Sequence, residues 1–390
     1  MELGEIILKR GKSDAIRRRH PWIFSGAIFK KKNCRSGHLA KVYDDKGAFL
    51  CQGHYHDGSI ALRILSFEEE SIDDRFWVRK IENALNLRKD LGLSRSDNNA
   101  FRLVHGEGDG LSGLIIDVYD SVAVIQCHTV GMYQSLDNIT AALSATMSEQ
   151  ITTMYSKLPS QGEGVSHLES GFLMGETDQV VILENGMKFK IDLVHGQKTG
   201  FLLDQRDNRL LLSEFVSEKS VTNLFSYTGG FSVYAGHGGA NQITSVDISE
   251  KAIDLCNANM ELNGYADKHK GISEDVMKYL KEIPNGSQEV MIVDPPAFAK
   301  SRKRSHNAVQ AYKRLNAKAI QCMKEDSWIF TFSCSQVIGT KLFQDTIRAA
   351  AIEAGREVQI IRNLSQGGDH PVNIFHPEGK YLKGLLLKIR

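Results

Sequence analysis

The stretch NLFSYTGGFS, residues 223–232, decides the fold of the C-terminal half of this chain. It begins with the last three residues of the short apolar run VTNLF and contains the paired glycines Gly229 and Gly230. Paired glycines let a backbone turn tightly and approach a ligand without a collision at Cβ. The pattern therefore predicts a strand followed by a ligand-binding turn.

From residue 197 onward, short apolar runs alternate with segments that can form helices. The runs are VTNLF, QITSVD, EVMIVD and WIFTFS. Such alternation is typical of a parallel sheet with crossover helices, in which ligands lie at the carboxyl ends of the strands. We therefore expect an α/β, Rossmann-like C-terminal domain over residues 193–390.

The second motif, SVDIS at residues 245–249, ends the next strand with Asp247, 18 residues beyond Gly229. An acidic side chain there can accept hydrogen bonds from both ribose hydroxyls of an adenosine. A nicotinamide dinucleotide also uses a glycine turn and an acid, but no GxGxxG fingerprint follows this strand. Asp275 could accept from an adenine amino group or merely cap an exposed helix, and the sequence leaves both open.

The third motif, VDPPAF, follows the apolar strand EVMIV. Pro295 and Pro296 stiffen the loop that begins at Asp294, so its carbonyl groups and Phe298 could face a flat base. In the other interpretation, Phe298 belongs to the core. Placed after two adenosine-type motifs, the loop favours methyl transfer to a planar nitrogenous substrate.

Cys334 ends the strand that follows this loop. A thiolate there would face the same crevice as Asp294 and could act as a nucleophile. Carbon 5 of a pyrimidine is too weak a nucleophile to attack a methyl sulfonium unless a thiolate first adds at carbon 6. The other interpretation is a buried core cysteine.

The N-terminal half has a different organisation. Residues 1–72 show short β-like runs separated by Gly, Asn and Asp, which predict a small β-rich domain. Residues 73–192 combine helical periodicity near RFWVRKIENAL with a hairpin pattern at GLIIDVY and SVAVIQCH, which predict a middle α+β domain.

Composition excludes some classes of protein. Hydrophobic residues make up 42% and charged residues 24% of the 390-residue chain, as in ordinary globular proteins. No apolar run is long enough for a membrane span, and the N-terminus has no secretion signal. The six cysteines form no CxxC pair, so we expect reduced thiols, no metal site and a cytoplasmic location.

Charge is concentrated at the N-terminus, where residues 1–41 hold eleven Lys and Arg against three acidic residues. Such a segment favours a polyanionic partner, because phosphate contacts supply most sequence-independent affinity for nucleic acid. Trp22 or Phe24 could stack on an unpaired base or fill the core of the small domain. The phosphate-binding candidates are Lys9, Arg10, Lys12, Arg17, Arg18 and Arg19.

Taken together, these motifs resemble the PUA-domain class I ribosomal RNA methyltransferases of the RlmI type, which form 5-methylcytosine in large-subunit rRNA. The resemblance covers essentially the whole chain. The resemblance also rests on the stretches LKRGKSDAIRRRHPWIFSGAI, FRLVHGEGDGLSGLIIDVYD, GQKTGFLLDQRDNR and FSCS. It implies a PUA-like RNA-binding domain, S-adenosylmethionine as cofactor and large-subunit rRNA as partner; a homodimer stays open.

The resemblance also assigns roles to residues. Cys334 would be the nucleophile, and Asp294 would hold the target cytosine, with Pro295, Pro296 and Phe298 beside it. Asp294-Pro295 stands where many RNA cytosine-5 methyltransferases carry Pro-Cys, so the group that removes the carbon 5 proton stays open between Asp294 and a water. The cofactor would contact Phe225, Ser226, Tyr227, Gly229 and Gly230 with its methionine part, Asp247 with its ribose, Asp275 with its adenine, and Asp204 and Gln205 near its amino-acid end.

Two other functions fit parts of the sequence. Loops of the form Asp-Pro-Pro-aromatic also hold an amino group for direct methylation of an RNA nitrogen, and Cys334 would then be dispensable. A non-catalytic RNA-binding or ribosome-assembly protein could keep the sheet without its chemistry, although the intact Gly229, Gly230, Asp247, Asp294 and Cys334 disfavour it.

Overall fold

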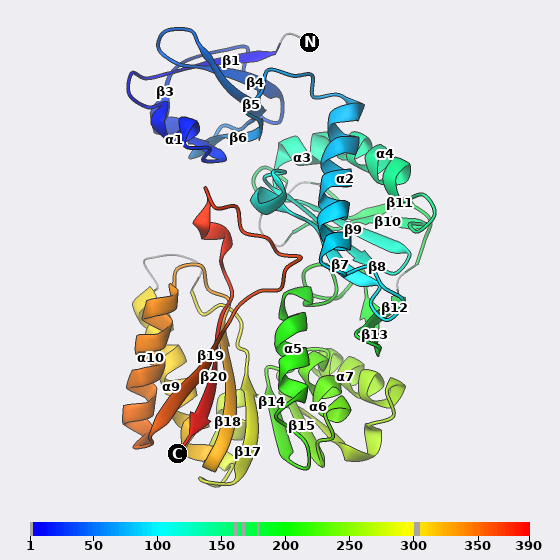
Figure 1. The fold of residues 1–390 in the computed structure, drawn as a ribbon, viewed down its shortest axis with the longest axis vertical. Coiled ribbons are helices and arrows are strands. Elements are labelled where there is room, and N and C mark those ends of the chain that lie inside the picture. Colours follow the sequence, from blue (N-terminus) through cyan, green and yellow to red (C-terminus); the bar gives the residue numbers. More distant parts are fainter. Residues whose placement is uncertain (1–2, 160–161, 166–167, 178, 300–304) are drawn as a thin grey trace. The chain divides into compact units, whose positions relative to one another are not determined.

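The computed structural model describes residues 3–159, 162–165, 168–177, 179–299 and 305–390 (Figure 1). The chain forms two compact units, each assembled from separate stretches of sequence. Unit 1 comprises Met1–Ile182, Ile191–Phe201 and Gly368–Gly379, and unit 2 comprises Leu183–Lys190, Leu202–Gly367 and Lys380–Arg390. The polypeptide therefore passes between the units five times. The domain boundaries at residues 72 and 192 stay predictions.

Unit 1 begins with a six-stranded sheet in the order β2-β6-β5-β4-β1-β3, which confirms the β-rich expectation. Its buried core includes Ile6, Val42, Cys51 and Leu62. The elements are β1 (Gly4–Leu8), α1 (Asp14–Arg17), β2 (Trp22–Phe24), η1 (Ser25–Ala27), β3 (Ile28–Lys32), β4 (Leu39–Tyr43), β5 (Phe49–Tyr55) and β6 (Ile60–Ser66).

The second part of unit 1 is a five-stranded sheet in the order β11-β10-β9-β8-β7, with α2 and α4 packed on it. The expected hairpin is the antiparallel pair β8 and β9, and the helical periodicity corresponds to α2, whose N-terminus is capped by Asp73. The elements are α2 (Asp74–Asp90), β7 (Ala100–His105), η2 (Gly106–Asp109), β8 (Leu114–Tyr119), β9 (Val122–Cys127), α3 (Val130–Gln134), α4 (Leu136–Met147), β10 (Thr153–Ser156) and β11 (Gly171–Met174).

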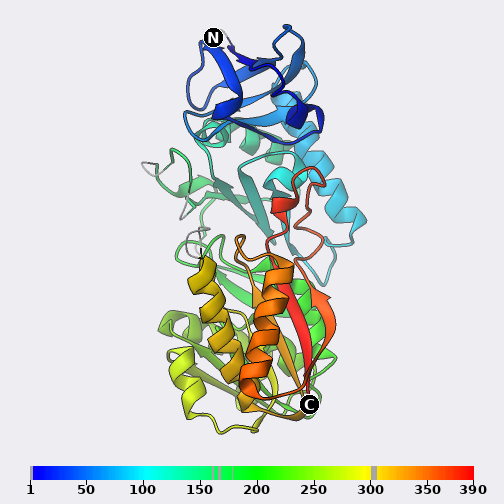
Figure 2. The same cartoon turned by 90° about the vertical axis from the view of Figure 1, so that its left-hand side faces the viewer.

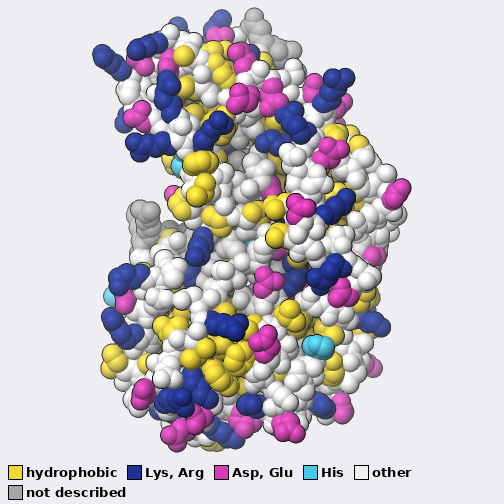
Figure 3. Space-filling model, viewed as in Figure 1, with side chains coloured by type: hydrophobic (Ala, Val, Ile, Leu, Met, Phe, Trp, Pro, Cys, Tyr) yellow, Lys and Arg dark blue, Asp and Glu magenta, His cyan; other side chains and the backbone are white. Residues whose placement is uncertain are grey.

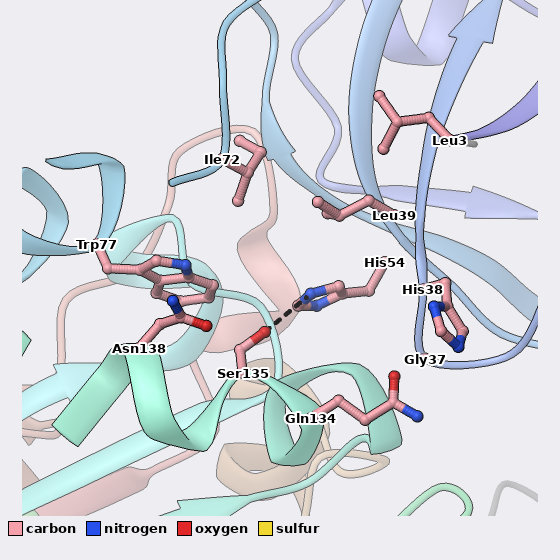
Figure 4. A pocket seen from close by; sticks show the side chains of 10 residues that line it. All are labelled: Leu3, Gly37, His38, Leu39, His54, Ile72, Trp77, Gln134, Ser135 and Asn138. Atoms are coloured by element: carbon pink, nitrogen blue, oxygen red, sulfur yellow. Dashed lines mark hydrogen bonds between the residues drawn. The ribbon is translucent and has the colours of Figure 1, made fainter. Parts of the chain in front are cut away.

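A cavity of about 410 Å³ lies within unit 1 between the first sheet and the α2–α4 region (Figure 4). His54 points into it, and its Nε2 lies 3.2 Å from Oγ of Ser135. Burial, aided by the charge of His38, lowers the pKa of His54 to about 4. His54 is therefore neutral at pH 7.

Unit 2 contains a seven-stranded sheet in the order β16-β15-β14-β17-β18-β20-β19. The first five strands in this order are parallel, whereas β20 is antiparallel to β18 and to β19. The α/β expectation is confirmed for the parallel part. The strands are β14 (Ser220–Leu224), β15 (Gln242–Asp247), β16 (His269–Ser273), β17 (Gln288–Val293), β18 (Met323–Ser333), β19 (Val358–Leu364) and β20 (Lys383–Ile389).

Helices cover both faces of this sheet. In Figures 1 and 2, α9 and α10 lie on one face and α5, α6 and α7 on the other. The chain fills the sheet outward from β14 through β15 to β16, then returns to place β17 on the other side of β14. The helical elements are η3 (Leu203–Gln205), α5 (Arg206–Ser213), α6 (Gly230–His237), α7 (Glu250–Leu262), η4 (Ala266–Lys268), α8 (Val276–Glu282), α9 (Ser305–Cys322), α10 (Thr340–Ala354) and, in the Gly368–Gly379 stretch of unit 1, η6 (Pro377–Gly379).

That return between β14 and β17 is a topological switch point. In open α/β sheets, ligands bind in the crevice beyond the carboxyl ends of the strands at such a point. The residues that follow β14 and β17 begin at Phe225 and Asp294. Two of the three sequence motifs therefore meet at the switch point itself.

One buried ion pair joins separate stretches of unit 2. Glu184 belongs to the hairpin of β12 (Gln179–Glu184) and β13 (Met187–Asp192), and its side chain is fully buried. Arg209 of α5 donates to both carboxylate oxygens of Glu184, at 2.8 and 2.7 Å. Arg206 lies 3.5 Å from the same carboxylate, so removing Glu184 would leave two buried arginines without their counter-charge.

Candidate active site

The turn after β14 is held in an unusual backbone conformation. Phe225, Tyr227 and Gly229 all have positive φ, at 57°, 46° and 83°. A Cβ built on Gly229 would lie 2.4 Å from Sγ of Cys256, so the turn has no room for a side chain there. Non-glycine residues at positive φ carry strain that often persists at ligand sites.

Asp247 closes this turn from the end of β15. Its Oδ2 accepts a hydrogen bond from N of Tyr227 at 2.9 Å, and its Oδ1 accepts from N of Ser249 at 3.0 Å. The half-buried carboxylate therefore joins the turns that follow the two strands. Ile248, the next residue, is 74% exposed and places an apolar side chain at the same sheet edge. The sequence analysis did not name Ile248, although its position directly after Asp247 in SVDIS could have marked it as a ligand-site residue.

Two features of this sheet edge fit an adenosine-type cofactor. Oγ of Ser226 is buried and has no hydrogen-bond partner among the described residues, so a ligand could supply one. The carboxylate of Asp247 is half-buried and can accept further bonds. Asp275 is exposed and caps α8 by accepting from N of Lys278 at 2.9 Å, which is the capping role that the sequence left open.

Asp204 and Gln205 form the buried 3₁₀ turn η3. Tyr381 donates its hydroxyl to Oδ2 of Asp204 at 2.7 Å. Nε2 of Gln205 donates to Oδ2 of Asp294 at 2.9 Å, and Oε1 of Gln205 accepts from Asn208 at 2.6 Å. The structure thus brings Gln205 to Asp294, where it fixes the orientation of that carboxylate.

The VDPPAF loop follows β17. Pro295 is buried and Pro296 is exposed, so the loop turns one proline inward and the other toward solvent. Phe298 is half-buried, and its ring lies 4.7 Å from that of Tyr312 on α9. Phe298 therefore packs against the edge of the core while part of its surface stays accessible.

Cys334 directly follows β18 and is half-buried. Its Sγ lies 4.0 Å from the carbonyl oxygen of Pro295. Ser335, the next residue, donates its hydroxyl to the carbonyl of Ala299 at 2.7 Å and so ties the two loops together. The thiol and the VDPPAF loop are therefore neighbours, as the sequence motifs predicted.

Two residues missed by the sequence reasoning surround Cys334. Lys383 at the start of β20 is buried, and its Nζ donates to the carbonyl oxygens of Ser335 at 2.6 Å and Tyr381 at 2.5 Å. Burial lowers the pKa of Lys383 to about 8, and the nearby Cys334 opposes that shift. Burial also raises the pKa of the Tyr312 phenol. The nearby Cys334 and Asp294 raise it further. The only sequence signal was a lysine opening an apolar run.

If Cys334 reacts as the thiolate that the sequence predicts, Lys383→Met should shift the rising limb of the pH–rate profile to higher pH. The Lys383 ammonium is charged below about pH 8 and favours the anionic form of a neighbouring thiol, so its loss disfavours the thiolate at neutral pH. The rate of the catalysed reaction between pH 6 and 9 measures the shift. Lys380→Met, at an exposed lysine of the same segment, is the control. An unchanged profile would show that Lys383 has only a packing role.

The six phosphate-binding candidates of the N-terminal segment belong to unit 1 and are exposed, and Figure 3 shows Lys and Arg side chains over this part. Arg17 is ion-paired with Asp44 at 2.9 Å, and the guanidinium of Arg19 lies 4.8 Å above the ring of Phe67. No ion pair is seen for Arg10, Lys12 or Arg18 within the described residues. These three are the most available to phosphates.

Trp22 and Phe24 differ in exposure. Phe24 is 50% exposed, so the interpretation that it fills the core is wrong. Trp22 is half-buried, and its Nε1 donates to Glu107 at 2.9 Å and to Ser112 at 3.1 Å. The polar edge of Trp22 is therefore already bonded, and Phe24 is the more exposed of the two rings.

No helix in the described part of the chain is both long and apolar enough to cross a membrane. Among the same residues, no group of three or more His, Cys, Asp and Glu is arranged to hold a metal ion.

Comparisons with known proteins agree with this geometry. Residues 101–354 match the family of S-adenosylmethionine-dependent methyltransferases, and residues 6–67 match the PUA-like domain. The chain is 38% identical to ribosomal RNA large subunit methyltransferase I of Alteromonas mediterranea, with 99% of each chain covered. It is 37% identical to the protein of that name from Escherichia coli, covering 98% of this chain and 99% of the relative.

Solved structures show the same fold. A SAM-dependent methyltransferase from Streptococcus mutans is 24% identical with a TM-score of 0.84, covering 98% of this chain and 99% of its own. A methyltransferase complexed with SAH gives a TM-score of 0.85 at 23% identity over the same shares. The chain therefore belongs to the ribosomal RNA large subunit methyltransferase I family, and it is an S-adenosylmethionine-dependent methyltransferase with an N-terminal PUA-like domain.

Proposed function

We propose that this enzyme methylates carbon 5 of a cytosine in large-subunit ribosomal RNA. The observation that carries the proposal is the position of Cys334, whose Sγ lies 4.0 Å from the Pro295 carbonyl at the switch point of the sheet. The names of the full-length relatives support rRNA as the substrate. The enzyme would act in the cytoplasm, where ribosomes are assembled; a homodimer stays open.

The chemistry requires a nucleophile of the kind that Cys334 supplies. Its thiolate adds to carbon 6 of the cytosine, and carbon 5 becomes nucleophilic enough to take the methyl group. Loss of the carbon 5 proton then lets the carbon–sulfur bond break, which returns the thiolate and leaves 5-methylcytosine. Because a duplex hides carbon 6, the target base must be unpaired or flipped out.

Asp294 would hold the cytosine through the polar edge of its ring. Gln205 already fixes the carboxylate through Oδ2, at 2.9 Å, so the group is positioned before the base arrives. Pro295, Pro296 and Phe298 would form the rigid wall beside the base. Asp294 or a water would take the carbon 5 proton.

S-adenosylmethionine supplies the electrophilic methyl group. We infer that Asp247 accepts hydrogen bonds from its ribose and that Asp275 meets its adenine. Ile248 adds an apolar surface for the adenine ring. The methionine part would lie along the strained turn of Phe225, Ser226, Tyr227, Gly229 and Gly230, with Asp204 near its amino-acid end; the unpartnered Oγ of Ser226 supports this assignment.

The experiment that tests the function is mass spectrometry of rRNA from a strain that lacks the gene. We expect one 5-methylcytosine in large-subunit rRNA to disappear, and to return when the wild-type gene is supplied. Loss of a methyl group from a guanine or adenine nitrogen instead would favour the second candidate function, because Asp-Pro-Pro-aromatic loops also hold amino groups for direct attack.

Removing two unpaired cations should weaken RNA binding and lower its salt dependence. We expect Lys12→Ala combined with Arg18→Ala to reduce the slope of log affinity against log salt by about 1.4, since each of the two phosphate contacts to a single strand contributes about 0.7. Fluorescence anisotropy with a labelled rRNA fragment measures the slope. Lys251→Ala combined with Lys281→Ala, at exposed lysines of α7 and α8, is the control, and an equal change there would refute a specific role for the N-terminal segment.

A further inference from the structure

A segment inserted between β19 and β20, Gly368–Gly379, belongs to unit 1 although both flanking strands belong to the sheet of unit 2. We call it the strap. Asp369 anchors it: its Oδ2 accepts from N of Arg102 at 3.0 Å, and its carbonyl accepts from Nη2 of Arg88 at 2.9 Å. Arg88 is itself fully buried and bonded to Asp109 at 2.8 Å. The start of the strap is therefore fixed to the core of unit 1.

The strap packs closely along its length. A Cβ built on Gly108 would lie 2.0 Å from the carbonyl oxygen of Pro371, so only glycine allows this approach. Further along, Nδ2 of Asn373 donates to the carbonyl of Glu107 at 3.2 Å. These contacts hold the strap against the β7–β8 connection rather than leaving it free in solvent.

Its tip nevertheless exposes apolar side chains. Ile374 is 84% exposed, Phe375 is 50% exposed and Val372 is 39% exposed. His376, the next residue, is 4% exposed and packs its ring 4.4 Å from that of Trp22. The anchored backbone thus turns a histidine inward and holds two large apolar groups in water, an arrangement that marks interaction sites when such groups gather.

A further exposed aromatic ring, that of Phe24 on β2, is linked to the strap through His20 and His376. His20 lies 5.7 Å from His376 and 6.1 Å from the half-exposed Phe24, measured between ring centroids. Both ring nitrogens of His376 are buried without a hydrogen-bond partner among the described residues. We define the strap patch as Phe24, Val372, Ile374 and Phe375.

Cations lie on the chain segments next to Phe24. Lys9 donates to the carbonyl of Gly26, two residues from Phe24, at 2.9 Å. Arg18 and Arg19 precede His20 and are exposed. Exposed rings next to cations are how proteins hold single-stranded nucleic acid, with bases on the apolar faces and phosphates on the cations.

We propose that the strap patch binds an unpaired stretch of the substrate RNA, with bases against Ile374, Phe375 and Phe24 and phosphates at Lys9, Arg18 and Arg19. This inference rests on the proposed rRNA substrate. It assigns RNA contacts to a segment that lies outside the PUA-like match, residues 6–67, and outside the methyltransferase match, residues 101–354.

The test is the double variant Ile374→Ser with Phe375→Ser, assayed for methyl transfer to an rRNA fragment. We expect KM for RNA to rise at least about tenfold, because a base loses its stack on Phe375 and an apolar contact with Ile374. The kcat at saturating RNA and the affinity for S-adenosylmethionine should not change. Ile352→Ser with Ile360→Ser, which replaces two exposed isoleucines of unit 2, is the matched control and should leave KM unchanged.

The outcomes separate the strap from the proposed function. An unchanged KM in an active double variant overturns the strap proposal and leaves the function intact. If the wild-type enzyme methylates no rRNA fragment, the function fails, and anisotropy with an unstructured labelled oligoribonucleotide still tests the strap. If the double variant binds RNA normally but abolishes a dimer seen by light scattering, the patch is a self-association surface and the proposal is overturned.

Discussion

Replacing Cys334 by alanine is expected to lower methyl transfer to rRNA by at least about 10³-fold while leaving S-adenosylmethionine affinity unchanged. Without the thiolate, carbon 5 of the cytosine is not activated, and binding alone cannot replace a covalent step. The side chain is half-buried at the end of β18 and small, so alanine should leave the sheet intact. Transfer of a labelled methyl group to an rRNA fragment measures the loss, and calorimetry measures cofactor affinity.

A second measurement traps the intermediate. RNA containing 5-fluorocytosine has no proton to lose from carbon 5, so the adduct with Cys334 should persist and migrate as a protein–RNA complex in a denaturing gel. Cys256→Ala, which removes a buried thiol next to the glycine turn, is the control and should still form the adduct. Full activity of Cys334→Ala would contradict the cytosine-5 mechanism and favour methylation of a nitrogen.

Replacing Asp247 by alanine should weaken S-adenosylmethionine binding by at least about 100-fold. Two effects add: the ribose loses its charged acceptor, and N of Tyr227 and N of Ser249 lose the carboxylate that holds the turn. Hydrogen bonds to charged groups contribute about 1.5–3 kcal/mol each, so two of them account for the factor. Calorimetry with the cofactor alone measures the change without requiring an RNA substrate.

Asp275→Ala is the matched comparison, because Asp275 is exposed and caps α8. It should cost about 1 kcal/mol of stability and less cofactor affinity than Asp247→Ala. Thermal unfolding of both variants separates lost folding from lost binding. Wild-type affinity in a folded Asp247→Ala variant would mean that the carboxylate serves only the turn.

The sequence was sufficient for the parallel part of the unit 2 sheet. Each motif follows an apolar strand, and strand ends in a parallel sheet share an edge, so Gly229, Asp247, Asp294 and Cys334 could be placed together before any contact was known. That reasoning uses only local pattern and chain order.

What the sequence could not predict arises from long-range packing. Gln205 lies 89 positions from its partner Asp294, and Lys383 lies 48 positions from the Ser335 carbonyl that it binds. The sequence analysis placed Gln205 near the amino-acid end of the cofactor rather than beside Asp294, and it quoted no motif that contains Lys383. The antiparallel strand β20 carries Lys383, and an apolar run alone does not state the direction of its pairing.

The exposure of Phe24 was unpredictable for a related reason. Only Ile23 of β2 is buried, so alternation along the strand places Phe24 on the same face as the half-buried Trp22. Which face of the strand packs on the core is set by the pairing of β2 with β6, and three apolar residues in a row do not state it.

The ion pair of Glu184 with Arg209 limits how this gene can be divided. A fragment that begins at residue 193 would contain Arg209 and the whole parallel sheet, yet it would lack the carboxylate that neutralises that arginine. The complementary N-terminal fragment, which ends at residue 192, would lack the strap. The stretches that build the two units therefore alternate along the gene. No single cut separates the gene into two complete units, so we expect recombination to exchange both units together.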